Sequence, residues 1–210
     1  SLPFTLNSAV DNLCKNEFDH YRAKAEPHPM FIEHGIDAVP FAHEKMDEWR
    51  NNFKGIRHIN EEAGYNFGGA VDDIWEKPNG DLIVIDVKST SKNVFDWEDT
   101  YSKWEYAKGY RRQLEMYQWL LEKNGFNVAA EGYLVYYNGK KHEPMFNQQL
   151  TFDLHLVKLE CDNSWVEEAV LNAKATLDGD MPKPSKSCEN CNYLRKRWEV
   201  SQKDPNKLVE

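Results

Sequence analysis

Residues 69–75 read GAVDDIW, residues 82–88 read LIVIDVK, and the turn sequence PNGD lies between them at residues 78–81. An Asn-Gly pair between two apolar runs is the strongest short-range signal for a β-hairpin, because both central residues of that turn need positive φ. The stretch therefore predicts two paired strands, over residues 65–75 and 82–88, joined by a tight turn at Asn79-Gly80.

Charged residues interrupt this apolar hairpin, among them Asp72, Asp86 and Lys88. Charged groups on a core hairpin cost free energy unless something pairs with them. Asp86 and Lys88 are two residues apart, so both side chains leave the same face of the sheet, and Asp72 lies across the hairpin. Two carboxylates suit Mg²⁺ or Mn²⁺, and a lysine beside them can orient or deprotonate a metal-bound water. The three residues indicate a centre that cleaves phosphodiesters.

The order of these residues resembles the PD-(D/E)XK nuclease superfamily, with Asp86-Val87-Lys88 as its Asp-x-Lys ending. Residues 110–117, YRRQLEMY, are similar to the Gln-x-x-x-Tyr helix of the RecB-like branch, which includes nucleases of recombination and CRISPR systems. The resemblance covers about residues 6–193. It implies an α/β fold with a restriction-endonuclease-like core, in which helices flank a mixed central β-sheet.

The resemblance also implies a ligand set for the metal ion. Asp72, Asp86 and the backbone carbonyl of Val87 would bind Mg²⁺ or Mn²⁺. RecB-like enzymes carry a histidine on the first helix, and Asp11, in NSAVD at residues 7–11, occupies that position here. His43 is the rival candidate. For both residues the alternative stays open that they are ordinary surface positions without a role in the site.

Three further side chains receive roles through the same resemblance. Lys88 would position the attacking water and stabilise the transition state. Gln113 would orient Lys88, the water or a phosphate. Tyr117, one helical turn further on, would support that face or touch the DNA backbone.

Periodicity predicts the remaining elements. A first helix from Thr5 or Asn7 to residues 21–24 would bury its apolar face, and a second helix would run over residues 42–52. The other expected elements are a helix over 98–124, a strand over 132–137 followed by a tight turn at Asn138-Gly139, a strand over 150–159 and a helix over 163–177. The nuclease domain would comprise residues 1–180, and residues 181–210 would form a C-terminal Cys-x-x-Cys tail.

The formal net charge of −9 and the pI near 5.3 argue against a protein that holds nucleic acid by bulk electrostatics. Local basic patches could still contact DNA. The sequence offers two of them, one formed by Lys108, Arg111 and Arg112 and one by residues 195–197. Each patch could equally be a solvated helix face.

Four cysteines are present, and Cys188 and Cys191 form a Cys-x-x-Cys pair, a spacing that can place two thiolates on one metal. Several RecB-like nucleases hold an iron–sulfur cluster with one N-terminal and three C-terminal cysteines. This chain has only two at the C-terminal end, so a complete cluster is doubtful. A zinc site, a disulfide and a remnant of a lost cluster are the alternatives.

We therefore expect a metal-dependent deoxyribonuclease, and a RecB-like exonuclease in preference to an endonuclease. Its partners would be DNA, single-stranded or with free ends, and a protein of a repair or CRISPR assembly. The alternatives are a catalytically silent nucleic-acid-binding or assembly domain on the same fold, and a structural ion-pair network in an unrelated α/β protein. The chain shows neither a signal-peptide pattern nor a membrane-spanning apolar run, so we expect a cytoplasmic protein.

Overall fold

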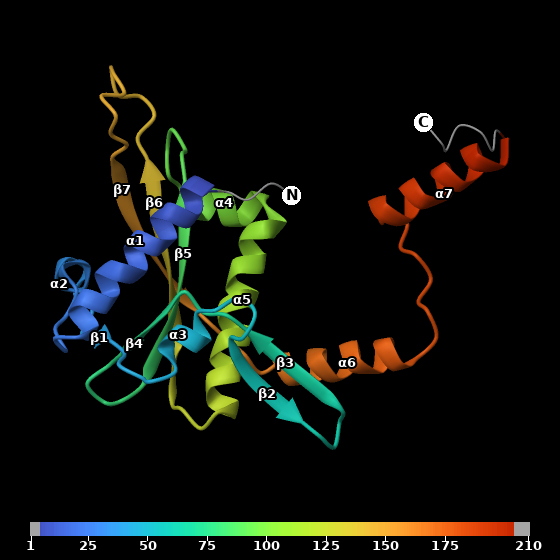
Figure 1. Ribbon diagram of the computed structural model, residues 1–210, viewed down its shortest axis with the longest axis horizontal. Coiled ribbons are helices and arrows are strands. Elements are labelled where there is room, and N and C mark those ends of the chain that lie inside the picture. The colour runs from blue at the N-terminus through green and yellow to red at the C-terminus, as the bar shows by residue number, and fades with distance from the viewer. Residues whose placement is uncertain (1–4, 204–210) are drawn as a thin grey trace. The chain divides into compact units, whose positions relative to one another are not determined.

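The computed structural model describes residues 5–203. The contacts divide the chain into two compact units, one up to Val170 and one from Leu171 onward, and each is described by itself. The elements are α1 (Thr5–Arg22), α2 (Pro29–His34), β1 (Val39–Pro40), α3 (Met46–Trp49), β2 (Ile56–Asn60), β3 (Tyr65–Gly69), β4 (Asp73–Glu76), β5 (Leu82–Thr90), α4 (Trp97–Lys103), α5 (Glu105–Lys123), β6 (Val128–Gly139), β7 (Phe152–Glu160), α6 (Val166–Asp178) and α7 (Glu189–Lys203) (Figure 1).

A five-stranded mixed sheet forms the centre of the first unit, in the order β1-β4-β5-β6-β7. β5 and β6 run parallel, and the other neighbouring strands run antiparallel. β2 and β3 form a separate two-stranded antiparallel sheet. The prediction of an α/β fold with a mixed central sheet flanked by helices is confirmed.

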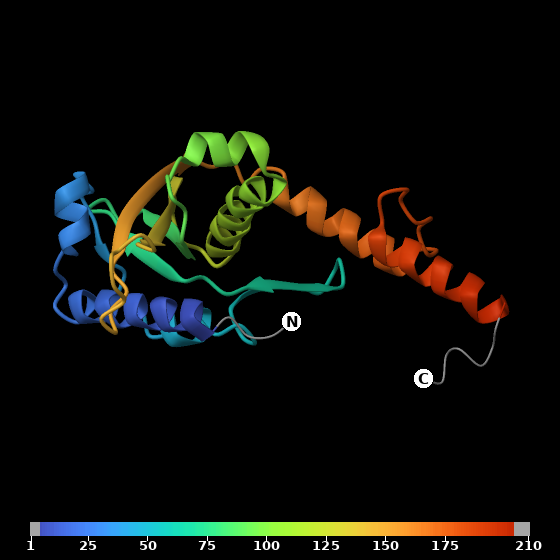
Figure 2. The same cartoon turned by 90° about the horizontal axis from the view of Figure 1, so that it is seen from above.

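Helices cover both faces of the central sheet: Figure 2 shows α1 on one face and α5 on the other. Successive residues of a strand point to opposite faces, and β5 follows this rule. Ile83 and Ile85 belong to the apolar cluster that contains Phe18 of α1. Leu82 and Val84 belong to the cluster that contains α5 residues such as Leu114 and Leu120. Asp86 and Lys88 continue the second series, so they face α5.

The single strand predicted over residues 65–75 is wrong. The chain forms β3, which pairs with β2, and then passes through residues 70–72 into β4, which pairs with β5. The crossing begins at Gly69, where a Cβ would lie 2.6 Å from Cε1 of Tyr117. Since β3 ends against α5, the chain must leave the small sheet at that point. The predicted hairpin therefore consists of β4 and β5 alone.

Other boundaries also differ from the prediction. The helix expected over 98–124 is two helices, because Trp104 adopts an extended backbone with φ −121° and ψ 119°. Asn138-Gly139 is no turn, because both residues pair with β7. Of the helix expected over 42–52, only the short α3 is formed. In α1, Leu6 and Leu13 are 62% and 68% exposed, since the buried face is formed by Cys14 and Phe18 instead.

The C-terminal segment contains more structure than the expected tail, because residues 189–203 form α7. The division between the two units falls inside α6, ten residues or so before the predicted boundary at residue 180. The assignment of residues 1–180 as the nuclease domain stays a prediction. None of the helices within residues 5–203 combines the length and the apolar character that a membrane crossing requires.

Candidate active site

A cleft of about 540 Å³, here called the carboxylate cleft, lies where β5 faces α1 and α5. All residues that the sequence predicts for the metal and catalytic site line this cleft, except His43. The lining residues are Asn7, Ser8, Val10, Asp11, Asn52, Ala70, Asp72, Asp86, Val87, Lys88, Ser89, Tyr110, Gln113 and Tyr117. Five segments far apart in the sequence thus contribute to one hollow.

The strand register brings the two carboxylates together. Asp73 pairs with Ile85, so the preceding residue, Asp72, lies opposite Asp86. Oδ2 of Asp72 accepts a hydrogen bond of 2.7 Å from the backbone N–H of Val87. The Nζ atom of Lys88 lies 2.5 Å from Oδ2 of Asp86. The Asp-x-Lys sequence therefore places an ammonium directly beside a carboxylate that faces the cleft.

Both carboxylates resist ionisation in this setting. Burial and the neighbouring charge of Asp72 raise the pKa of Asp86 to about 7. Burial also raises the pKa of Asp72, although nearby lysines act in the opposite direction. Oδ2 of Asp86 is buried, and the ammonium of Lys88 lies 2.5 Å from it in an ion pair. A carboxylate buried in this way suits a nearby cation, which stabilises its charged form.

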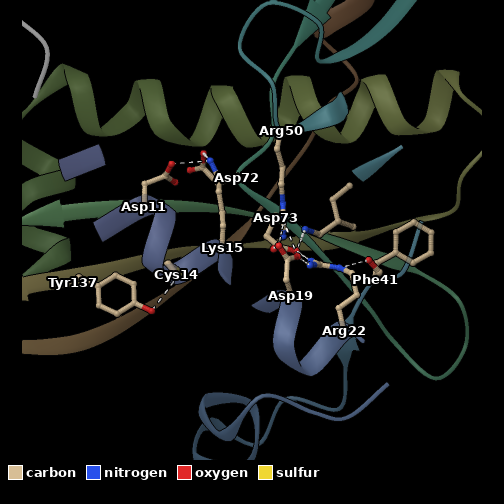
Figure 3. A network of polar contacts seen from close by, with 11 residues as sticks. Asp11, Cys14, Lys15, Asp19, Arg22, Phe41, Arg50, Asp72, Asp73 and Tyr137 are labelled. Carbon is tan, nitrogen blue, oxygen red and sulfur yellow. Dashed lines mark hydrogen bonds and ion pairs between the residues drawn. The ribbon is translucent and has the colours of Figure 1, made fainter. Parts of the chain in front are cut away.

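Lys15 is a site residue that sequence reasoning missed. Its Nζ lies 2.8 Å from Oδ2 of Asp11 and 3.8 Å from Oδ1 of Asp72 (Figure 3). The i,i+4 spacing of Asp11 and Lys15 is the only signal in the sequence, and it is equally typical of a solvated helix. Asp11, proposed above as a metal ligand, therefore has an ammonium partner that also reaches Asp72.

Helix α5 supplies the opposite wall. The ammonium of Lys88 lies 4.5 Å from the centroid of the Tyr110 ring, a cation–π contact. The side-chain amide of Gln113 donates a hydrogen bond of 2.8 Å to Oη of Tyr117. Burial raises the pKa of Tyr117 to about 12, so its phenol stays neutral at physiological pH. Tyr110 was missed as a site residue, although its place one turn before Gln113 puts both side chains on one helix face.

The structure does not bring His43 to the cleft. Its ring stacks on Trp49 with centroids 4.4 Å apart and an interplanar angle of 14°, and it also contacts Phe126. Nδ1 accepts a hydrogen bond of 3.1 Å from the backbone N–H of Lys45. His43 thus belongs to an aromatic cluster and caps the turn before α3, and we do not retain it as a ligand.

Asp73, the neighbour of Asp72, points to the other face of the sheet and is fully buried (Figure 3). Its Oδ1 accepts a hydrogen bond of 2.5 Å from Nη2 of Arg22, and its Oδ2 accepts one from Arg50. Arg50 also donates to Asp19 at 2.8 Å. This group, here called the arginine clamp, is a structural ion-pair network. Asp72, Asp86 and Lys88 differ from it, because they line a cleft and because Lys88 forms its ion pair with Asp86 rather than bridging the two carboxylates.

The donor set limits what the cleft could hold. Within residues 5–203, no three His, Cys, Asp or Glu side chains gather as a complete metal-binding group. A cation at Asp72 and Asp86 would need backbone oxygens and water as its other ligands. Mg²⁺ accepts such a shell, because it keeps several waters and uses one or two carboxylates. The residues present therefore fit Mg²⁺ or Mn²⁺ rather than a fully enclosed metal.

The cysteines are divided between the two units, with Cys14 and Cys161 in the first and Cys188 and Cys191 in the second. Cys14 is buried in α1 with its Sγ 3.4 Å from Oη of Tyr137, and Cys161 is half-buried after β7. In the second unit, the N–H of Cys191 donates a hydrogen bond of 3.2 Å to Sγ of Cys188 at the start of α7. All four thiols are free. A role of Cys188 and Cys191 in holding iron–sulfur or zinc stays a prediction.

Comparisons with known proteins give the following. A model of the PD-(D/E)XK nuclease superfamily matches residues 4–195. No curated protein matches the chain. A solved structure titled "Crystal structure of SSO0001" is 21% identical, with a TM-score of 0.30, over 60% of this chain and 48% of that one. The chain thus spans about half the length of that protein, and so weak a likeness carries no argument.

Proposed function

Because the chain belongs to the PD-(D/E)XK nuclease superfamily, we propose that it is a Mg²⁺- or Mn²⁺-dependent deoxyribonuclease, and an exonuclease of the RecB-like kind. One observation carries the proposal. Asp72, Asp86 and Lys88 line one open cleft, and the ammonium of Lys88 lies 2.5 Å from a buried oxygen of Asp86. A partner in a repair or CRISPR assembly and a cytoplasmic location belong to the same proposal.

Asp72, Asp86 and the carbonyl of Val87 would hold the metal ion, which supplies a polarised phosphoryl oxygen and an activated water when bound. Lys88 carries its proton at Nζ and places a positive charge where negative charge develops on the phosphorus oxygens. The Tyr110 ring holds that ammonium from the side of α5. The hydrogen bond to Tyr117 fixes the amide of Gln113 toward the same cleft.

Replacing Lys88 by Ala tests the proposal. We expect metal-dependent cleavage of end-labelled single- or double-stranded DNA by the wild type, and a rate lower by roughly 10²–10⁴-fold for Lys88→Ala, the usual contribution of a proton-transferring or charge-stabilising side chain. Reactions with Mn²⁺, Mg²⁺ or EDTA establish the metal requirement. The pattern of labelled products separates exonuclease from endonuclease.

Lys108→Ala is the matched control, because Lys108 is an exposed α5 lysine that pairs with Glu105 outside the cleft. Equal losses in both lysine variants would contradict the special role of Lys88. If the folded, metal-loaded wild type binds DNA without cutting it, the nuclease proposal is wrong and the catalytically silent nucleic-acid-binding domain takes its place.

Metal affinity should depend on pH. The pKa of Asp86 is raised to about 7, so a cation must displace a proton from this carboxyl below that pH and need not do so above it. We expect Mn²⁺ affinity, followed by electron paramagnetic resonance, to rise about tenfold from pH 6 to pH 8 and to level off above. Asp86→Asn should remove this dependence, whereas a flat wild-type profile would exclude Asp86 as the titrating ligand.

A further inference from the structure

Two smaller hollows continue from the carboxylate cleft along the edge of the sheet. The first, here called the exit groove, has a volume of about 260 Å³ and shares Asn7, Val10 and Ser89 with the cleft. The second, here called the lysine pocket, has a volume of about 230 Å³ and shares Gly139 with the exit groove. The three hollows therefore adjoin one another in series from Lys88, and they are together called the path here.

The parallel pairing of β5 and β6 explains why the path exists. The two strands end at the same edge, where Thr90 pairs with Asn138. Asn138 is buried and fastens the segment after β5, because its Oδ1 accepts a hydrogen bond of 2.7 Å from the N–H of Lys92. Its Nδ2 in turn donates to the carbonyl of Lys92 at 3.1 Å. Lys92 and the β6–β7 connection are thereby held beside each other.

Two of the three lysines that line the lysine pocket donate to uncharged partners. Nζ of Lys92 donates to the hydroxyl of Thr100 at 2.6 Å, and Nζ of Lys141 donates to the carbonyl of Ser91 at 2.7 Å. Both acceptors are uncharged. Lys140 differs, since it pairs with Asp153 at 2.8 Å. Glu143 and His142 also line the pocket, so the three lysines exceed the two carboxylates by one charge.

The basic patch suggested by the sequence lacks this property. Lys108 and Arg112 both pair with Glu105, and Arg111 pairs with Glu115. Those cations sit among carboxylates of their own helix. In a chain with a net charge of −9, the ammonium groups of Lys92 and Lys141 are therefore a more suitable place for a phosphate than α5.

The exit groove adds an apolar wall between these cations and the cleft. Leu6, Val10, Leu150 and Phe152 line it together with Ser89, Thr90 and Ser91. Apolar and aromatic side chains of this kind suit the faces of unpaired bases. The bases of a duplex keep their faces stacked inside the helix, so such a wall fits a single strand.

We propose that the lysine pocket binds the phosphate backbone of a single DNA strand whose scissile phosphate lies at Lys88, and that the exit groove receives the intervening unpaired bases. This inference rests on the proposed nuclease function and specifies its substrate. Lys92 lies four positions after Lys88, a span of about 13 Å in extended chain. A strand must therefore extend a few nucleotides beyond the cleavage site to reach Lys92 and Lys141.

Salt-dependent binding tests the inference. The probe is a fluorescein-labelled oligothymidylate of about a dozen nucleotides, and its affinity is measured by anisotropy over a series of KCl concentrations, with Ca²⁺ and Lys88→Ala as the background to prevent cutting. Each lost phosphate contact with a single strand should lower the slope of log affinity against log salt by about 0.7. We expect the double variant Lys92→Ala, Lys141→Ala to lose about 1.4 from that slope.

The matched control is Lys108→Ala, Arg112→Ala, which removes two cations that are already paired with Glu105. Its slope should equal that of the background protein. A double variant of Lys92 and Lys141 that melts at the same temperature yet keeps the full slope overturns the inference. So does an equal loss on a blunt duplex, because the path would then not select a single strand. Failure of the wild type to cut any DNA refutes the proposed function instead, since binding is measured separately.

Discussion

Asp72→Asn is expected to abolish metal-dependent cleavage while leaving the fold intact. The variant loses one of the two cleft carboxylates, and with it several kcal/mol of charge stabilisation, which corresponds to a rate about 10³-fold lower. The hydrogen bond from the N–H of Val87 can persist, because an asparagine oxygen also accepts it. Single-turnover cleavage in Mn²⁺ measures the loss.

The same variant should unfold at an equal or higher temperature without metal. The pKa values of Asp72 and Asp86 are both raised in the folded protein, so their contribution to stability is present at low pH and is lost as the pH rises through about 7. Removing one charge relieves this penalty. A gain of about 1 kcal/mol would raise the melting temperature by about 2–4 °C, and it should be larger at pH 8 than at pH 5. A lower melting temperature at pH 8 would contradict this account.

Asp73→Asn should have the opposite outcome, although it changes the next residue in the chain. The carboxylate of Asp73 is fully buried between Arg22 and Arg50. Removing one partner of a buried ion pair leaves an uncompensated charge and typically costs about 3–5 kcal/mol. We expect the melting temperature to fall by on the order of 10 °C. Thermal and urea unfolding at pH 7 measure the effect.

Comparison of Asp72→Asn with Asp73→Asn separates the effect on cleavage from the effect on stability. Below its lower melting temperature, Asp73→Asn should retain cleavage within a few-fold of the wild type, because the arginine clamp does not line the carboxylate cleft. If Asp73→Asn proved as stable as the wild type, the clamp would not be the structural element described here. If it lost activity while folded, Asp73 would belong to the site.

The sequence predicts the centre of the site well because that centre rests on local spacing. Asp86 and Lys88 share a face through the two-residue period of a strand, and Gln113 and Tyr117 share a face through the four-residue period of a helix. Asp72 was placed correctly for the same reason, although Asp73 is chemically identical. Asp72 lies two residues before Ile74, which pairs with Val84, so Asp72 shares the sheet face of these two residues and Asp73 does not.

The parts that sequence reasoning missed depend on contacts between distant segments. The break at residues 70–72 gives no recognisable signal in the local sequence, and it begins at Gly69, where the ring of Tyr117 approaches the backbone. Lys15 becomes a site residue only because α1 packs beside β5. Lys92 and Lys141 come together only because β5 and β6 end at one edge. The sequence instead offered the basic residues near Gln113 as a possible DNA contact. Their ion pairs with Glu105 and Glu115 become visible only in the folded helix.

The arginine clamp also bears on how faithfully the chain folds. A slip of β4 by one residue would exchange the two neighbouring aspartates, so that Asp72 faced the guanidinium groups and Asp73 faced the cleft. Charge alone would tolerate that exchange, but the apolar residues that follow would then point to the wrong faces, with Trp75 turned away from Phe31 and Phe18. The aromatic cluster that packs against α1 therefore fixes the register of β4. It thereby determines which of two chemically identical carboxylates faces the carboxylate cleft.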